Sequence, residues 1–418
     1  CDESTFNAIL RSSCWTRVWT VQEFANTHVS ILCQNSNMVS FAGITKMMRH
    51  SSYFHGQLET HRDSYDDCQA FGHMDPLTVS HHALRLYLRL QAAELRDTIF
   101  AFRAISTNVF AKIKVDYRRP LRDLFTETSM VVITETNNLY LLYFASLERT
   151  SLEGTETGWM PSWSLDFGTK DSHESYRGAH MDQSAKYASA SRGSYPLIFF
   201  PEPGISLRVL GRSVDVIGNF VSDFDPTDNS LLMKKTAMEK QPRSRVDEND
   251  TGSASSASDS RSRLMTLMEN FVAIVHRKLG MNTLSEPKMV ELLFELLRTV
   301  VELADNTPVP IPSLAPNATF RDFLEVLYND EDLIFRFKFD IGEGRIFFTI
   351  DGRAGLGVPR ISEGDEIFLV AGLQHPFVLR PHGDNGEYTL VGPAVVTGMM
   401  MGELWPDDEH ELRDIDIV

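Results

Sequence analysis

The stretch of this chain with the most distinctive residue pattern is Cys14-Trp15-Thr16-Arg17-Val18-Trp19-Thr20-Val21-Gln22-Glu23-Phe24-Ala25. Its apolar residues between positions 18 and 25 recur near the helical period, which predicts a helix. A shorter helical run precedes it at residues 6–10, and the strand-like sequence Val29-Ser30-Ile31-Leu32-Cys33 follows it. This order of helix, helix and strand is typical of an α/β domain.

Three further blocks follow the opening run. They are Leu95-Arg96-Asp97-Thr98-Ile99-Phe100-Ala101, Val115-Asp116-Tyr117, and Met160-Pro161-Ser162-Trp163-Ser164 with Asp166 close behind. Between and around them, apolar spacing predicts a helix over 82–95 and another from about 120 to 136, the second with Pro120 in its first turn.

Together these blocks resemble motifs of the heterokaryon-incompatibility (HET) domains of filamentous fungi. The opening run is similar to the family's pattern of aromatic, x, Arg, Val, Trp, x, x, Gln, Glu, and the last block is similar to its closing Pro-Ser-Trp-x-x-Asp. The family's opening block, with its Trp-Ile-Asp-x-x-Cys-Ile-Asn-Gln motif, does not occur in the sequence, which starts at Cys1. The resemblance implies that residues 1–166 are the C-terminal part of a HET domain.

HET domains in turn resemble Toll/interleukin-1 receptor (TIR) domains, flavodoxin-like folds of which some members hydrolyse NAD. A Trp and a Glu four residues apart open a helix in TIR domains, and Trp19 and Glu23 reproduce that spacing on one helical face. The resemblance implies that Glu23 is a catalytic carboxylate that stabilises an oxocarbenium-like transition state at the ribose. NAD is then the candidate substrate, and no bound cofactor is expected. The supporting residues would be Trp15, Arg17, Trp19, Gln22, Arg96 and Asp97.

A structural interpretation of the same residues stays open. The two tryptophans would be core aromatics, and Arg17 and Glu23 would form an ion pair across the helix start. For Arg96 and Asp97, helix capping is favoured over phosphate binding, because adjacent opposite charges before an apolar helix usually serve its first turn. No metal site is expected, because the spacings within one polar loop fit no regular zinc ligand pair; its members are His50, His55, His61, Cys68 and His73.

Composition excludes several classes of protein. Lys and Arg number 40 against 57 Asp and Glu, a formal charge of −17 that would repel a phosphate backbone, so no nucleic-acid partner is expected. The longest apolar runs are strand-sized, so no membrane span is predicted. All four cysteines lie within the first 68 residues, without a CxxC pair, which favours a reducing, cytoplasmic compartment.

Beyond residue 166 the pattern changes. Residues 167–204, rich in Ser, Gly, Tyr and His, predict a linker, and residues 205–418 predict a β-rich module. Its strands are expected at 206–210, 214–217, 344–350, 366–370, 377–379, 388–391 and 395–397. An insertion at about 223–334 should contain helices at 264–279, 288–303 and 320–328, and a disordered run at 241–263. The glycine-rich residues 352–357 are expected to form a turn, and Asp365 and Arg380 to lie in loops.

The predicted fold is therefore α/β, a partial TIR/flavodoxin-like HET domain, followed by a β-rich C-terminal module with a helical insertion. The resemblance implies a cytoplasmic effector or sensor of fungal non-self recognition that triggers regulated cell death. Two mechanisms stay open. The first is NAD hydrolysis through Glu23, which would require the family's opening block. The second is a signalling adaptor that assembles with itself or with protein partners without chemistry, and an inactive truncated relic is the remaining alternative.

Overall fold

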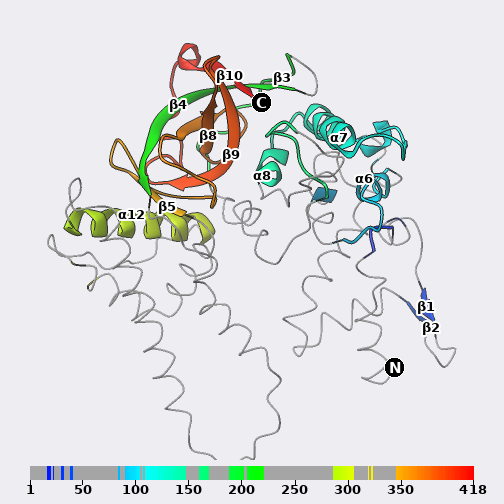
Figure 1. Cartoon of the computed structure of the whole chain (residues 1–418). Helices are drawn as coiled ribbons and strands as arrows, with labels where there is room; N and C mark the ends of the chain where they lie inside the picture. The colour runs from blue at the N-terminus through cyan, green and yellow to red at the C-terminus, as the bar shows by residue number, and fades with distance from the viewer. Residues whose placement is uncertain are drawn as a thin grey trace, which may run out of the picture.

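The structure is a computed structural model that places two groups of elements side by side (Figure 1). The residues that it describes are 17–19, 22, 30–32, 38–40, 83–84, 90–103, 106, 109–146, 160–168, 188–201, 205–220, 286–305, 319, 322 and 345–418. Short strands and helices make up the N-terminal group, and a β-barrel with one long helix makes up the C-terminal group.

The N-terminal group is mainly helical where it is described. Strands β1 (Ser30–Leu32) and β2 (Met38–Ser40) form an antiparallel pair, and β1 confirms the strand expected at 29–33. Helices α6 (Asp97–Phe100), α7 (Leu121–Thr136) and α8 (Leu141–Ala145) follow, with a 3-10 turn η4 (Phe110–Lys112) between α6 and α7. The TIR-like arrangement of this part stays a prediction.

Helix α7 confirms the helix expected from about residue 120 to 136. Pro120 is its N-cap, one residue before the first turn, with φ −54° and ψ 137°. Asn137 ends the helix in the left-handed conformation, with φ 46°. Two buried hydroxyls, those of Thr128 and Ser129, donate to the carbonyls of Leu124 and Phe125 one turn earlier, at 2.7 and 2.9 Å. The buried face therefore tolerates polar residues because each hydroxyl has an acceptor.

The helix expected over 82–95 is wrong in its second half. Ala83 and Leu84 are helical, but Gln91 forms an isolated parallel bridge with Arg17. The Gln91 carbonyl accepts the backbone N–H of Val18 at 3.0 Å. Pairing with a segment far away in the sequence replaces the local helical hydrogen bond, and the helix resumes only at Asp97.

The C-terminal group is a closed barrel. Its strands are β4 (Leu207–Phe220), β5 (Arg345–Thr349), β6 (Ala354–Gly357), β7 (Glu366–Val370), β8 (Phe377–His382), β9 (Glu387–Val396) and β10 (Arg413–Ile417). The strand order is β10-β4-β5-β6-β9-β8-β7, and the extra pairings β4–β7 and β9–β10 close it. Every pairing is antiparallel except β9–β10. A further short strand, β3 (Ile198–Phe199), pairs with β4.

Strand β4 holds the barrel together. Its first residues pair with β10, its middle with β7, and its end with β5. This confirms that the strands near 205–218 pair with those after residue 344. The two strands expected at 206–210 and 214–217 are one strand, because Gly211 lies inside the sheet. A Cβ at Gly211 would meet the Leu369 carbonyl oxygen at 2.5 Å and Ile415 Cδ1 at 2.8 Å, so the missing side chain lets β7 and β10 approach.

The turn expected at 352–357 is wrong for its second half, which is strand β6. A Cβ at Gly355 would lie 2.2 Å from Phe347 Cζ, so the glycine leaves room for a fully buried ring on the neighbouring strand β5. The glycines of this segment thus serve packing within a sheet as well as a turn.

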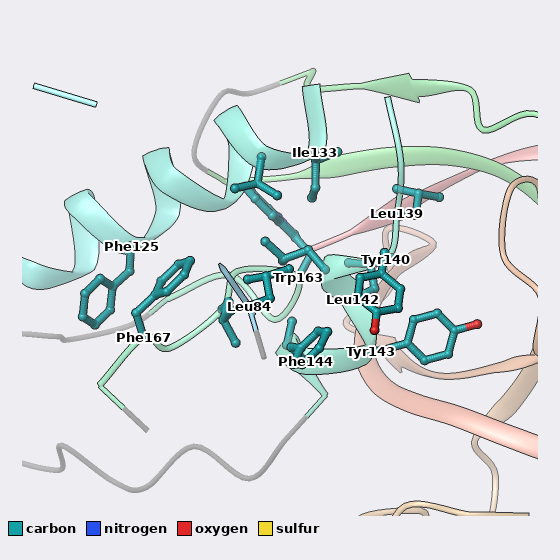
Figure 2. Packing of buried hydrophobic residues seen from close by; sticks show 14 of the residues in the cluster. Leu84, Phe125, Ile133, Leu139, Tyr140, Leu142, Tyr143, Phe144, Trp163 and Phe167 are labelled. Carbon is teal, nitrogen blue, oxygen red and sulfur yellow. The ribbon is translucent and has the colours of Figure 1, made fainter. Parts of the chain in front are cut away.

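Buried apolar side chains of the barrel strands belong to several clusters. One is formed by Ile217, Phe347, Val358, Ile361, Ile367, Val378, Val391, Ala394, Val396 and Met399. Neighbouring residues of β7, β8 and β9, such as Phe368, Leu379 and Leu390, belong to a larger cluster. That cluster also contains the buried residues of α6, α7 and α8, several of which appear in Figure 2. The N-terminal group and the barrel therefore share one hydrophobic core.

Helix α12 (Glu286–Asp305) packs against β6 and β9 and confirms the helix expected at 288–303. Its buried side chains are Met289, Val290, Leu292, Leu293, Phe294, Leu296, Leu297, Val300 and Leu303, and Glu291, Glu295, Arg298 and Glu302 are exposed. The helix is thus amphipathic, as surface helices of globular proteins are. In the part of the chain that the structure describes, no helix has the length and apolar character needed to cross a membrane.

Residues 188–201, at the end of the predicted linker, pack against the barrel. Ala190 is fully buried and its N–H donates to the Gln374 carbonyl at 2.9 Å. Arg192 donates to the Gly402 carbonyl at 2.9 Å and pairs with Asp407 at 2.6 Å. This stretch belongs with the barrel. The disordered run expected at 241–263 and the helix expected at 264–279 lie outside the described residues. Of the helix expected at 320–328, only Asp322 is described, and it is helical.

Candidate functional site

The candidate site begins with the segment that carries Trp19. The pairing of Arg17 and Val18 with Gln91 fixes this segment beside the block that contains Asp97. The side chain of Trp19 is partly buried against the large core cluster, and that of Arg17 is exposed. A backbone hydrogen bond thus ties the segment of Trp19 to Gln91, four residues before the block at 95–101.

Asp97 joins three of the sequence blocks. Its Oδ2 accepts the indole N–H of Trp19 at 3.0 Å, and its Oδ1 accepts the hydroxyl of Tyr117 at 2.8 Å. The ring of Tyr117 also packs edge-on against Phe100, with centroids 5.2 Å apart. Hydrogen bonds to an ionised acceptor are the stronger kind in proteins, so Asp97 links the blocks at 17–19, 95–101 and 115–117. We call Trp19, Asp97 and Tyr117 the Asp97 hub.

Gln22 holds the other end of helix α6. Its side-chain amide donates to the carbonyl of Ala101 at 2.8 Å, and Ala101 directly follows the last residue of α6. Carbonyls at a helix end lack partners within the helix, so this bond satisfies one of them. Trp19 and Gln22, three residues apart, therefore hold α6 at its first residue and just beyond its last.

Arg96 is buried and makes two kinds of hydrogen bond. Its Nε donates to the carbonyl of Arg119 at 3.0 Å, and its Nη1 lies 2.7 Å from Glu94 Oε1. The hydrogen bond from Arg96 is the main reason that the pKa of Glu94 lies below its usual value. The expected capping is wrong in this respect, because no side chain caps the start of α6 and both Arg96 and Asp97 bond to other segments.

Asp97, the hydrogen-bond acceptor in the hub, raises the pKa of Tyr117. The hydrogen bond to Asp97 raises the pKa of Tyr117 to about 12, with smaller contributions from burial and from the charge of Asp97. The phenolate would face the carboxylate at hydrogen-bond distance, so the neutral phenol is favoured. Tyr117 therefore stays a hydrogen-bond donor across the physiological pH range.

The block at 160–166 joins the N-terminal group to the barrel. Ser162 N–H donates to the Val418 carbonyl at 2.9 Å, and the Leu390 N–H donates to Ser162 Oγ at 2.8 Å. Trp163 is fully buried, donates to the Ile205 carbonyl at 3.3 Å, and lies among the residues of α7 and α8 in Figure 2. The block at 160–166 thus contacts β9, the residue after β10 and the residues just before β4.

A second connection runs from α8 to the barrel. The Tyr143 hydroxyl lies 2.9 Å from His375 Nδ1, and the Tyr143 ring packs edge-on against Phe377. Arg360 Nη2 donates to the Ser146 carbonyl at 2.6 Å and to the Val391 carbonyl at 2.8 Å. No motif in the sequence pointed to these residues, because their roles depend on which elements become neighbours.

Two carboxylates of the barrel are buried and paired with arginines that reach the surface. Asp365 accepts two hydrogen bonds from Arg380, at 2.7 and 3.0 Å, and Asp215 accepts one from Arg353 at 2.7 Å. Asp365 also accepts the N–H of Ser362 at 2.7 Å. The expectation of a loop is confirmed for Asp365, which lies between β6 and β7 outside either strand. It is wrong for Arg380, which lies in β8 and forms a bidentate ion pair with Asp365.

Two predicted site residues, Trp15 and Glu23, lie outside the described part of the chain. So does the polar loop in which no metal site is expected, with His50, His55, His61, Cys68 and His73. Among the residues that are described, no group of three or more His, Cys, Asp or Glu side chains is placed to hold a metal ion. The structure brings together Trp19, Gln22, Asp97 and, unforeseen as a partner, Tyr117.

Comparison with known proteins gives one match. Residues 339–415 match the family described as the Het-6 beta-barrel domain. No curated protein and no solved structure matches the chain. The matched segment contains β5 to β9 and most of β10, whereas β4 lies outside it. The match therefore relates the chain to heterokaryon incompatibility through its barrel.

Proposed function

We propose that this protein acts in fungal heterokaryon incompatibility, as an effector or sensor of non-self that leads to regulated cell death. The observation that carries the proposal is the match of residues 339–415 to the Het-6 beta-barrel domain. The HET-like blocks of the N-terminal part add to it, because they lie on the same chain and meet in the Asp97 hub.

In this proposal the N-terminal part and the barrel act as one unit. The contacts that support it are those of Ser162 with β9 and with Val418, and those of Tyr143 with His375 and Phe377. The two groups of elements also share one buried cluster. A partner that displaced the barrel would therefore disturb the helices that support the Trp19 segment.

For the mechanism, the enzymatic proposal assigns NAD hydrolysis to Glu23. Cleaving the nicotinamide–ribose bond requires stabilisation of a developing positive charge on the sugar, which one carboxylate can supply. Trp19 would form a wall of the site. The hydrogen bond from its indole to Asp97 supports that assignment, because a wall must keep its orientation when the ligand binds.

A second candidate is a signalling adaptor that performs no chemistry, and one observation favours it. The Trp19 indole N–H and the Tyr117 hydroxyl both bond to the Asp97 carboxylate, and Gln22 Nε2 bonds to the carbonyl of Ala101 just after α6. This is the pattern of a structural hub, in which polar groups satisfy each other. The HET motif would then preserve a binding surface.

Two experiments test the proposal and separate the mechanisms. The first expresses the chain, preceded by a HET opening block, from an inducible promoter in a filamentous fungus and measures hyphal death. Death should require both parts, so a chain ending before β5 should be harmless. The assigned role would be overturned if hyphae that express the intact protein survived contact with every incompatible partner strain.

The second experiment purifies the same protein, with the HET opening block included, and measures its release of nicotinamide from NAD. Glu23→Gln keeps the size of the side chain and removes its charge, so it should abolish turnover under the enzymatic mechanism. Glu291→Gln, on the exposed face of α12, is the matched control and should leave turnover unchanged. Cell death that persists in Glu23→Gln, without nicotinamide release by either protein, would establish the adaptor mechanism.

A further inference from the structure

An apolar row lies on the outside of the segment that leads into β4. The side chains of Tyr195, Leu197 and Phe199 are 86, 61 and 59% exposed. They alternate with Pro196, Ile198 and Phe200, which are partly buried, and Ile198 and Phe200 pack against the large core cluster. Single exposed apolar side chains are ordinary, but an alternating row on one extended segment marks a surface with a binding role.

This row lies on the edge strand β3. Ile198 pairs with Val209 and Phe199 with Arg208, and in the described part of the chain no strand pairs with the other edge of β3. Residues 194–201, Ser-Tyr-Pro-Leu-Ile-Phe-Phe-Pro, contain no charged side chain. Natural edge strands are usually protected by charges, bulges or a covering element, and here only the two flanking prolines limit pairing.

The charged side chains beside the row already have partners. Arg208 forms a bidentate pair with Asp416, at 2.7 and 2.8 Å, and Arg212 lies 2.7 Å from Glu411. These residues lie on β4 and on or next to β10, so the charges are balanced within one copy. The unsatisfied part of the surface is apolar side chains and strand backbone, which calls for an apolar strand and not for a charged ligand.

We propose that the open edge of β3 pairs with β3 of a second copy of this chain. Antiparallel pairing of one strand with itself is isologous, so a two-fold axis would place the two rows of Tyr195, Leu197 and Phe199 side by side. Each apolar row would then contact the same apolar row of the other copy. The sheet would then continue from β10 through β4 and β3 of one copy into β3 and β4 of the other.

The size of the row sets the expected strength. A buried aromatic side chain contributes about 150–250 Å². With the exposed fractions of the row, the three side chains offer on the order of 400 Å² per copy, or roughly 800 Å² for the pair before strand backbone is counted. Specific interfaces begin at about 1,000 Å² in total, so the dimer should be reversible. Because each copy carries a formal charge of −17, added salt should strengthen the association by screening the repulsion.

Sedimentation equilibrium of the 418-residue chain at several concentrations and salt levels tests the proposal. A monomer–dimer equilibrium that tightens with salt is expected, and Phe199→Asp should weaken it on the order of a hundredfold, because the symmetric contact receives two charges. The matched control is Ile350→Asp, at a 70% exposed apolar position next to the end of β5, which should leave the dimer unchanged. Thermal melting of both variants confirms that they are folded.

Three results would overturn the proposal. The first is a monomer at every concentration, which would leave the row to another segment of the chain or to a different protein. The second is an equal loss of dimer in Ile350→Asp, which would indicate nonspecific association. The third is a dimer that weakens as salt is added, which would show that charge pairs hold it together.

Discussion

Removal of the Asp97 carboxylate is the most informative perturbation of this protein, because one side chain holds two others. In Asp97→Ala, the Trp19 indole N–H and the Tyr117 hydroxyl both lose their acceptor. In Asp97→Asn, the amide oxygen can still accept from Trp19, and the amide N–H can donate to the Tyr117 oxygen, since a phenol accepts as well as donates. The two variants therefore separate geometry from charge.

The expected magnitudes follow from the contacts. A hydrogen bond to a charged group contributes about 1.5–3 kcal/mol. Trp19 is partly buried and Tyr117 is half exposed, so water replaces part of the loss. We expect Asp97→Ala to lower the free energy of unfolding by about 2–4 kcal/mol and Asp97→Asn by about 1 kcal/mol, because only the charge assistance is lost in the second.

Urea unfolding followed by far-ultraviolet circular dichroism measures both losses. The matched control is Asp116→Ala: the Asp116 carboxylate is exposed and accepts only the nearby N–H of Arg118 at 2.9 Å in the described contacts. Its loss should cost at most about 0.5 kcal/mol. If Asp97→Ala were no less stable than Asp116→Ala, the hub would not support the fold, and the sequence blocks that meet in it would need an explanation in binding or catalysis.

Three further predictions concern titration and packing. The phenolate absorbance of Tyr117, isolated as the difference between the parent and Tyr117→Phe, should titrate near pH 12 and move back toward pH 10 in Asp97→Ala. Because folding raises the pKa of Tyr117, the stability that this hydrogen bond contributes is complete below about pH 10 and is lost as the pH rises through about 12. Gly355→Ala should lower the free energy of unfolding by about 1–3 kcal/mol through overlap with Phe347, and Phe347→Leu should recover part of that loss, as a double-mutant cycle of urea unfolding will show. Trp163→Ala should cost about 3–5 kcal/mol in the same assay and destabilise barrel and helices together.

Each of these has an outcome that contradicts it. Titration of Tyr117 that is unchanged in Asp97→Ala would show that Asp97 does not set the pKa. Gly218→Ala is the control for the Gly355 cycle, because a Cβ at Gly218 meets nothing closer than Ile350 Cγ1 at 3.3 Å. Equal losses at the two glycines would refute the packing argument. For Trp163→Ala, separate melting of barrel and helices would refute the shared core.

The elements that the sequence predicted well are those whose partners are local or whose pattern is strong. Helix α7 has a proline at its start and an asparagine at its end, and α12 has one broad apolar face. Strand β7 coincides with the expected 366–370, because Glu366 and the four apolar residues after it form a short run bounded by turns. In these cases the local preference agrees with the final contacts.

The errors came from residues whose role depends on distant neighbours. Glycine ordinarily marks a turn, but Gly211 and Gly355 lie within strands because Ile415 and Phe347 occupy the space of their missing side chains. Gln91 lies outside a helix, contrary to the prediction, because its carbonyl accepts the backbone N–H of Val18. Likewise, the sequence could name Asp97 but not Tyr117 as its partner, since only the folded chain brings residues 20 positions apart into contact.

The family match at residues 339–415 covers only part of the barrel. A segment consisting of residues 339–415 would hold β5 to β9 but would lack β4, the strand between β5 and β7. Both of those strands would present an open edge, and the cluster around Phe347 would lose Ile217. An open edge together with an exposed apolar face favours aggregation over folding. The folding unit must therefore extend at least to β4, across the insertion that contains α12, so the barrel forms only when segments about 130 residues apart in this sequence pair. Strand β4 pairs with β10, and Trp163 donates to the carbonyl of Ile205, two residues before β4 begins. The strand that closes the barrel therefore also connects it to the N-terminal group.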